Sequence, residues 1–456
     1  MFQNRDSSFK ISGTLQEIAG MKGPIVIIGA GFTGLAAAYE LTRRGIPVVV
    51  LEKEADIGGL ADSFKINGQQ IEKFYHHWFN NDQYIIELIK ELNRQEQILF
   101  SSTATAIYLN NKFYKLSTPM DLLRFGALNI LDRIRLGLLV LKARRVKNWK
   151  ELDTLSAEEW LIKLCGRNVY KTVWEPLLRG KFGPYAGQIS AVWIWNKLVL
   201  RGGSRDKAGG ETLAYYRRGF GTLAETIAEK IKSSGGVIKT STPAEEIIVR
   251  EGCVKAIKTP AGVIEAEAVI ATPALPIIAD LLSPYVSGEY IDKLKAVKYL
   301  ANVCLVLELS HRLSDFYWLN VAEPDFPFVG IIEHTNFQPP EDYSGRHIVY
   351  LSKYLESTDK MYNMNREQIA ALSLPYIKRM FPDFDDAWIN RYYVWKARYA
   401  QPVISRSYGQ TVPANQTPVK GFYIATMAQI YPEDRGTNYA VREGRRIAGM
   451  AADKIT

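Results

Sequence analysis

Residues 24–64 read PIVIIGAGFTGLAAAYELTRRGIPVVVLEKEADIGGLADSF. The stretch opens with a short apolar run bounded by glycine, which is typical of a buried parallel strand. Gly29, Gly31 and Gly34 then form a G-x-G-x-x-G motif that leads into a predicted helix over 35–44 and a second apolar strand over 48–51. The first glycine makes a tight turn, the second admits a pyrophosphate, and the third lets the helix pack on the strand. The stretch therefore predicts a dinucleotide-binding fold with a phosphate at the helix N-terminus.

The residues after the second strand favour a particular dinucleotide. Glu52 ends that strand about 20 residues after the glycines, where a carboxylate binds a ribose hydroxyl. Gly58 and Gly59 follow, and a glycine pair lets a loop fold back over the diphosphate. This pattern resembles the FAD-binding signature of the superfamily of flavin amine oxidases, protoporphyrinogen oxidases and phytoene desaturases. Many members have an arginine after the pair, where this chain has Leu60.

Two later stretches extend the same resemblance. In that superfamily, a strand block such as 244–273 returns to the cofactor, and a strand and helix such as 421–454 place N–H groups beside the flavin ring. No motif for a covalent flavin link occurs, so we expect non-covalent FAD. The cofactor contacts that the resemblance implies are Gly29, Gly31, Phe32, Thr33, Gly34, Glu52, Lys53, Gly58, Gly59, Leu60, Ala244, Ala271, Thr272, Pro273, Thr437, Asn438 and Tyr439.

Two adjacent histidines are the candidate catalytic residues. His76 and His77 lie among aromatic residues directly after the first FAD-binding stretch. The run ending in Phe79 is similar to one in UDP-galactopyranose mutases, where a histidine lies against the flavin. A histidine there can bond a ring atom or act as an acid or base, since its pKa is near neutral. The alternative is a structural pair packed between aromatic side chains.

The candidate substrate contacts come from the rest of the chain. Arg179 and Lys181 are cations among aromatic residues and glycines, where they could bind an anionic part of a substrate or be surface charges. His334 ends a predicted strand in an aromatic-rich part of the chain. The many aromatic residues of 290–415 favour a large, mainly apolar pocket.

Residues 120–145 are predicted to form one long amphipathic helix with a basic end. Its interleaved charges exclude a transmembrane span. One interpretation is a helix that lies on a membrane or lines a lipid tunnel. The other, which we favour, is a core helix of a cap domain, because amphipathicity is first a packing signal.

Composition limits the classes of partner. The net charge of +9 is compatible with an acidic lipid surface, a nucleotide-sugar or a diphosphate. No nucleic-acid module appears, so we expect no nucleic-acid partner. The three cysteines have no pair spacing, which argues against a zinc cluster and for a reducing, cytoplasmic compartment.

Together these patterns predict an α/β protein, with a Rossmann-like FAD-binding domain interleaved with a mixed-sheet substrate domain that carries a helical cap. We assign 1–20 to a flexible leader, 21–75, 202–290 and 416–456 to the FAD-binding domain, and 76–201 and 291–415 to the substrate domain. The expected function is that of an FAD-dependent oxidoreductase that oxidises or desaturates an apolar or aromatic small molecule by hydride transfer to flavin N5. The alternatives are a reduced-flavin mutase or isomerase acting on a nucleotide-sugar, and a non-catalytic lipid or prenyl binder.

Overall fold

A five-stranded parallel sheet carries the glycine motif. The computed structural model describes residues 23–203 and 211–453, so the predicted leader lies outside the described residues. All neighbouring strands of this sheet run parallel, as the apolar runs predicted. Their order is β10 (Val237–Lys239), β2 (Val48–Leu51), β1 (Ile25–Ile28), β14 (Ala268–Ala271) and β20 (Phe422–Ile424).

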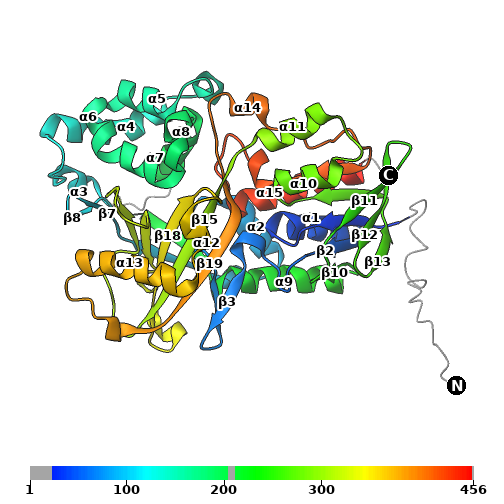
Figure 1. The fold of residues 1–456 in the computed structure, drawn as a ribbon, viewed down its shortest axis with the longest axis horizontal. Coiled ribbons are helices and arrows are strands. Elements are labelled where there is room, and N and C mark those ends of the chain that lie inside the picture. The colour runs from blue at the N-terminus through cyan, green and yellow to red at the C-terminus, as the bar shows by residue number, and fades with distance from the viewer. Residues whose placement is uncertain (1–22, 204–210, 454–456) are drawn as a thin grey trace.

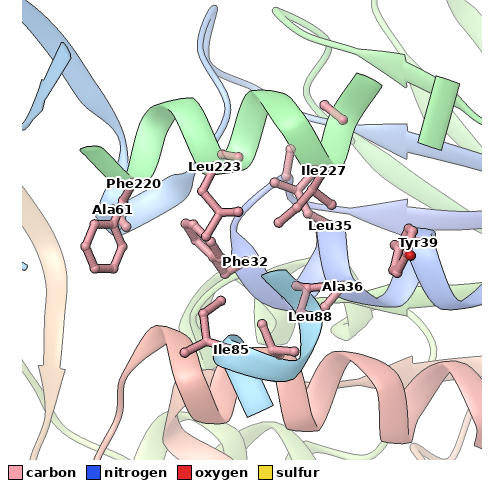
Figure 2. Close-up of a cluster of buried hydrophobic side chains, with 14 of the residues drawn as sticks. Phe32, Leu35, Ala36, Tyr39, Ala61, Ile85, Leu88, Phe220, Leu223 and Ile227 are labelled. Carbon is pink, nitrogen blue, oxygen red and sulfur yellow. The ribbon is translucent and has the colours of Figure 1, made fainter. Parts of the chain in front are cut away.

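Helix α1 (Phe32–Arg43) joins β1 to β2 and is enclosed by three other helices, α2 (Gln83–Glu91), α9 (Gly219–Ser233) and α15 (Thr437–Ala452). Figure 2 shows Phe32, Leu35 and Leu223 at the junction of α1 with α9. Glycines permit the close packing: a Cβ on Gly34 would lie 1.9 Å from the carbonyl oxygen of Gly29, and one on Gly444 would lie 2.3 Å from that of Thr33. Gly34, the third glycine of the motif, therefore lets the helix pack closely on the strand, as its spacing predicted.

A mixed seven-stranded sheet lies beside the half of the molecule that holds the parallel sheet (Figure 1). Its strands lie within the segments assigned to the substrate domain, and those of the parallel sheet lie within the segments assigned to the FAD-binding domain; the domain boundaries themselves stay a prediction. Its order is β19 (Ile389–Pro402), β15 (Tyr299–Leu309), β18 (His347–Leu355), β17 (Gly330–Glu333), β16 (Trp318–Val321), β7 (Thr105–Leu109) and β8 (Lys112–Lys115).

Three smaller sheets complete the strand structure. The turn between β3 and β4 has positive φ at Asn67 and Gly68, as a type I′ hairpin requires. Residues 211–215 belong to β9, and 204–210 lie outside the described residues. The sheets are β3 (Ser63–Ile66) with β4 (Gln69–Glu72); β5 (Trp78–Phe79), β9 (Glu211–Tyr216) and β6 (Ile98–Thr103); and β11 (Glu246–Arg250), β12 (Cys253–Thr259) and β13 (Gly262–Glu265).

A group of helices, α4 to α8, covers one end of the seven-stranded sheet (Figure 1). The single helix predicted over 120–145 is wrong: Phe125 and Leu128 are buried in a corner between two helices, and Asn129 caps the second. The helices of this region are α3 (Pro119–Leu123), α4 (Ile130–Arg144), α5 (Ala157–Cys165), α6 (Arg167–Val169), α7 (Glu175–Phe182) and α8 (Ala191–Gly203).

The remaining helices are α10 (Leu275–Leu282), α11 (Gly288–Ala296), α12 (Lys360–Asn363), α13 (Arg366–Met380) and α14 (Tyr408–Thr411). Of these, α10, α11 and α14 lie in connections between the two larger sheets, and α12 and α13 lie between β18 and β19 of the seven-stranded sheet. Within residues 23–203 and 211–453, no helix combines the length and apolarity needed to cross a bilayer. Cys165, Cys253 and Cys304 are free thiols.

Candidate active site

The N-terminus of α1 lies where two glycine loops meet. Its N-cap is Gly31, and no side chain caps the helix, so no side-chain acceptor competes for its first N–H groups. The N–H of Gly58 donates to the carbonyl oxygen of Ala30 at 2.9 Å. A Cβ on Gly59, whose φ is +62°, would lie 3.1 Å from Cα of Gly31. The Gly58–Gly59 loop therefore folds back onto the G-x-G-x-x-G motif, as its position in the sequence predicted.

Glu52 is buried at the end of β2. Its carboxylate accepts the N–H of Ala30 at 2.8 Å and that of Glu54 at 3.0 Å. A carboxylate has about four acceptor positions, so two remain for ribose hydroxyls. The N–H of Thr242 donates to the Glu52 carbonyl at 2.7 Å, which brings Ala244 to the same end of the sheet.

The end of β14 is tied to the end of β1. The N–H and the hydroxyl of Thr272 each donate to the carbonyl oxygen of Ile28 at 2.9 Å. Ala271 pairs with Ile28 in register, and Pro273 follows beside Gly29. The predicted turn thus lies at the carboxyl edge of the parallel sheet, where open α/β sheets bind ligands. Lys53, in contrast, is exposed and pairs with Glu54 at 3.1 Å.

The N-terminus of α15 contacts the segment that carries the two histidines. Its N-cap, Gly436, leaves the helix without a side-chain cap. The hydroxyl of Thr437 accepts the indole N–H of Trp78 at 2.6 Å, and Oδ1 of Asn438 accepts the N–H of Ile85 at 3.1 Å. Two helix N-termini without side-chain caps, a loop approach that only glycine permits and a buried ribose-type carboxylate together fit FAD.

A cavity of about 360 Å³ lies between the helical cap, the seven-stranded sheet and the start of α15. Two of its lining residues each have a buried polar atom without a hydrogen-bond partner in the described structure: Nε1 of Trp174 and Oδ1 of Asn302. Such atoms are destabilising unless a bound molecule satisfies them. The wall is rich in aromatic side chains, as predicted: Phe74, Tyr75, Trp78, Phe79, Trp174, Trp193, Trp318, Tyr354 and Tyr439.

On one side of this cavity, cationic side chains lie near a buried carboxylate, Asp434. Asp434 bonds Lys197 Nζ at 2.5 Å and accepts the indole N–H of Trp193 at 3.0 Å. Burial alone would raise its pKa, but the nearby charges of Lys197, Lys181 and Arg435 outweigh burial and hold the Asp434 pKa well below its usual range. Asp434 is therefore ionised at neutral pH.

The other two cations also contact uncharged side chains. Arg435 donates to Gln401 Oε1 at 2.9 Å and to the Tyr354 hydroxyl at 3.1 Å. Lys181 Nζ lies 5.1 Å from the centre of the Trp193 ring and 5.3 Å from that of Tyr354. The cavity lining carries three cations, Lys181, Lys197 and Arg435, and two carboxylates, Asp82 and Asp434, so positive charges outnumber negative ones.

Both histidines line the cavity. His76 Nδ1 lies 2.5 Å from the carbonyl oxygen of Phe74. A carbonyl only accepts, so Nδ1 carries the hydrogen, and burial lowers the pKa of His76 to about 4. The ring is then neutral at pH 7, with Nε2 as an acceptor. His77 Nδ1 instead bonds the hydroxyl of Tyr317 at 2.9 Å.

The three predicted substrate contacts are not brought together. Lys181 lines the cavity, whereas Arg179 is exposed and bonds Glu175, its neighbour one turn away on α7. His334 does not belong to the cavity lining; it is buried, bonds the hydroxyl of Tyr343 at 2.7 Å, and has its pKa lowered to about 3 by burial.

Lys197, Asp434 and Arg435 are cavity residues that the sequence reasoning missed. Asp434 and Arg435 lie in the charged segment 432–436, directly before the predicted last helix, and these charges were the available signal. Glu72, four residues before His76, was missed as well. It is fully buried, accepts the hydroxyl of Tyr215 and the N–H of Phe220, and has its pKa raised to about 7 by burial.

A known protein family matches nearly the whole chain. A family model described as "Flavin containing amine oxidoreductase" matches residues 32–450. Pseudooxynicotine dehydrogenase from a Pseudomonas species is 26% identical over 268 residues, which are 56% of this chain and 52% of that protein. The match thus spans about half the length of this curated relative.

Solved structures share the fold. One is a protein from Exiguobacterium sp. 255-15, provisionally assigned as a protoporphyrinogen oxidase, with a TM-score of 0.77, 15% identity, and coverage of 95% of this chain and 100% of that one. Another is reduced UDP-galactopyranose mutase, with a TM-score of 0.74, 16% identity, and coverage of 95% and 94%. At these identities the likeness concerns the fold alone.

Proposed function

Because the chain belongs to the flavin-containing amine oxidoreductase family and is an enzyme of that family, we propose that it binds FAD non-covalently and oxidises or desaturates an apolar or aromatic substrate that carries an acidic group. The aromatic cavity with its excess of positive charge carries this proposal. A non-catalytic binder is no longer an alternative for an enzyme of this family.

Residues already described would hold the cofactor. The N–H groups of Gly31, Phe32 and Thr33 at the start of α1 would bind the diphosphate, and Glu52 would bind the ribose. The start of α15, at Thr437, would meet the ring. When bound, FAD accepts a hydride from a substrate carbon at its N5 atom.

The acidic group of the substrate would lie beside Arg435, Lys181 and Trp174. The indole N–H of Trp174 is a buried donor that needs an acceptor, and an anionic oxygen is the acceptor that the neighbouring cations favour. The aromatic rings would then contact the apolar part of the substrate. Arg435 is suited to a carboxylate or phosphate because its planar guanidinium donates in a fixed geometry.

His76 would act as a hydrogen-bond acceptor at Nε2 and not as a base. A group with a pKa of about 4 binds a proton weakly at neutral pH. The bond from Nδ1 to the Phe74 carbonyl fixes the tautomer, so Nε2 can accept an N–H or O–H from a ligand in the cavity. His77, which also lines the cavity, bonds the buried hydroxyl of Tyr317 through Nδ1.

One observation favours a second candidate function. Three cations and an indole N–H would also suit the diphosphate of a nucleotide-sugar, which a reduced-flavin mutase would bind without net oxidation. The two functions differ in what they do to the cofactor. An oxidase or desaturase substrate would bleach oxidised flavin, whereas a mutase would turn over only after chemical reduction.

An anaerobic absorption spectrum of the purified protein tests the proposal. We expect a flavin spectrum, release of the yellow colour into the supernatant on acid precipitation, and bleaching by a member of a panel of apolar or aromatic acids. A protein that remains colourless after incubation with FAD would refute the proposal. Turnover of a nucleotide-sugar only after reduction by dithionite would replace it with the mutase.

A further inference from the structure

Seven large hydrophobic side chains are exposed on the corner formed by α3 and α4. Only fourteen such side chains are exposed in the whole described structure, so half of them lie within 22 residues of sequence, 120–141. Ile130 and Leu131 are 70% and 68% exposed. We call this set the α3–α4 face; it comprises Met120, Leu123, Ile130, Leu131, Ile134, Leu138 and Leu141.

The α3–α4 face is separate from the face by which α4 packs on the protein. At about 100° per residue, the exposed side chains of α4 fall within one arc of about 100°, and the buried Asp132, Leu139 and Ala143 lie on the opposite side. The carbonyl oxygen of Ala143 accepts the indole N–H of Trp195 at 3.0 Å. The core-helix interpretation therefore holds for one face of α4, and a second apolar face remains exposed.

The corner between the helices is held firmly. Arg133 donates to the carbonyl oxygens of Leu123 at 2.6 Å and Leu128 at 2.8 Å, and both Phe125 and Leu128 are buried. Met120 and Leu123 on α3 are thereby fixed beside α4. The exposed side chains of α3 therefore belong to a helix that is held in place beside α4.

The exposed charges of residues 119–150 have one sign. Residues 119–150 contain eight basic and two acidic side chains. One acid, Asp132, is buried and bonds Arg135 and Asn168, and the other, Asp121, caps α3. The exposed charges of this stretch are all basic: Arg124, Arg135, Arg144, Arg145, Lys147 and Lys150.

We propose that the α3–α4 face binds the surface of a lipid bilayer that contains anionic lipids. An apolar arc bordered by arginine and lysine matches the interfacial region of such a bilayer, where side chains enter the acyl boundary and cations pair with headgroups. Contiguous exposed apolar patches are rare in soluble monomers and mark interaction sites. The uniformly basic rim favours an anionic lipid surface over a second copy of the chain, because two such rims repel each other.

Co-sedimentation with vesicles tests this inference. We expect the full-length protein to bind vesicles of phosphatidylcholine with about a third phosphatidylserine at low salt, and to bind phosphatidylcholine vesicles much less. The double variant Ile134→Asp with Leu138→Asp should bind at least about tenfold more weakly, because charged side chains enter the acyl boundary poorly. The pair Arg144→Glu with Arg145→Glu should lower binding to the anionic vesicles alone.

A matched control is Val263→Asp, which adds a charge at an exposed apolar position of β13, far from α4 in the fold. It should bind vesicles as the unmodified protein does, and circular dichroism should show that every variant is folded. Failure of the unmodified protein to sediment with anionic vesicles would overturn the inference. So would a dimer in solution that the Ile134→Asp and Leu138→Asp pair dissociates, because the occupant would then be a second copy.

Discussion

Replacing Asp434 by Asn tests the charge arrangement of the cavity. The two side chains have the same shape, and the amide oxygen can still accept the indole N–H of Trp193, which lies 3.0 Å from Asp434 Oδ1. The change removes the negative charge that Lys197 contacts at 2.5 Å. Arg435 and Lys181 lose the same neighbour, so the three cations are left without this carboxylate.

Two effects of opposite direction follow. Removing one partner of a buried ion pair destabilises a protein by about 3–5 kcal/mol. Because the pKa of Asp434 is lowered in the folded state, the ion pair contributes its full stability at every pH above the ordinary carboxyl pKa of 3.8, including pH 7. This stability is lost only as the pH falls through the lower folded-state pKa. An anion entering the cavity, in contrast, meets one more unit of positive charge and should bind about tenfold more tightly.

The assay is urea unfolding of the FAD-loaded protein at pH 7, with and without inorganic pyrophosphate. We expect Asp434→Asn to lower the free energy of unfolding by about 3–5 kcal/mol and to gain more stability from pyrophosphate than the unmodified protein does. The control is Asp325→Asn, which breaks an exposed pair with Arg379 and should change stability by about 1 kcal/mol or less. Equal gains from pyrophosphate in both proteins would refute the reasoning.

Three further predictions concern the cofactor loop, a buried acid and the cavity wall. Gly34→Ala should lose FAD fluorescence quenching and about 1–3 kcal/mol of stability, because its Cβ would lie 1.9 Å from the Gly29 carbonyl oxygen, whereas Gly187→Ala, with open space around it, should keep both. Burial raises the pKa of Glu72 from 4.5 to about 7, so the free energy of unfolding of the unmodified protein should fall by about 3 kcal/mol as the pH rises from 4.5 to 7. Urea unfolding of Glu72→Gln over the same pH range should show no such fall. Trp174→Phe should raise the KM for an acidic substrate about tenfold while its methyl ester reacts unchanged, and equal effects on both would contradict the role given to the indole N–H.

The parts of the fold with local signals could be predicted from the sequence. The glycine spacing, the apolar runs and the Asn67–Gly68 turn each specify backbone geometry within a few residues. The division of 120–145 into two helices was missed because no proline marks it; the break depends on the burial of Phe125 and Leu128 against the rest of the cap. Strand β9 was missed because its partners, β5 and β6, are more than 100 residues earlier in the chain.

The cation cluster of the cavity could not be read from the sequence for a related reason. Lys181 and Lys197 lie on two helices of the cap, and Asp434 and Arg435 precede the last helix, so only the tertiary fold brings them together. The prediction also grouped Arg179 with Lys181. Two residues that are two positions apart on a helix are separated by about 200° of rotation. Lys181 therefore lines the cavity, whereas Arg179 points to solvent.

The proposed activity requires both a flavin and an acid-binding cavity, and one measurement addresses both. It is the anaerobic absorption spectrum of the purified protein mixed with apolar or aromatic acids and, separately, with their methyl esters. We predict that the flavin band bleaches with at least one acid and more than tenfold more slowly with its ester, because Trp174, Lys181 and Arg435 favour the anion. Bleaching at equal rates by acid and ester, or by neutral substrates alone, would contradict the account.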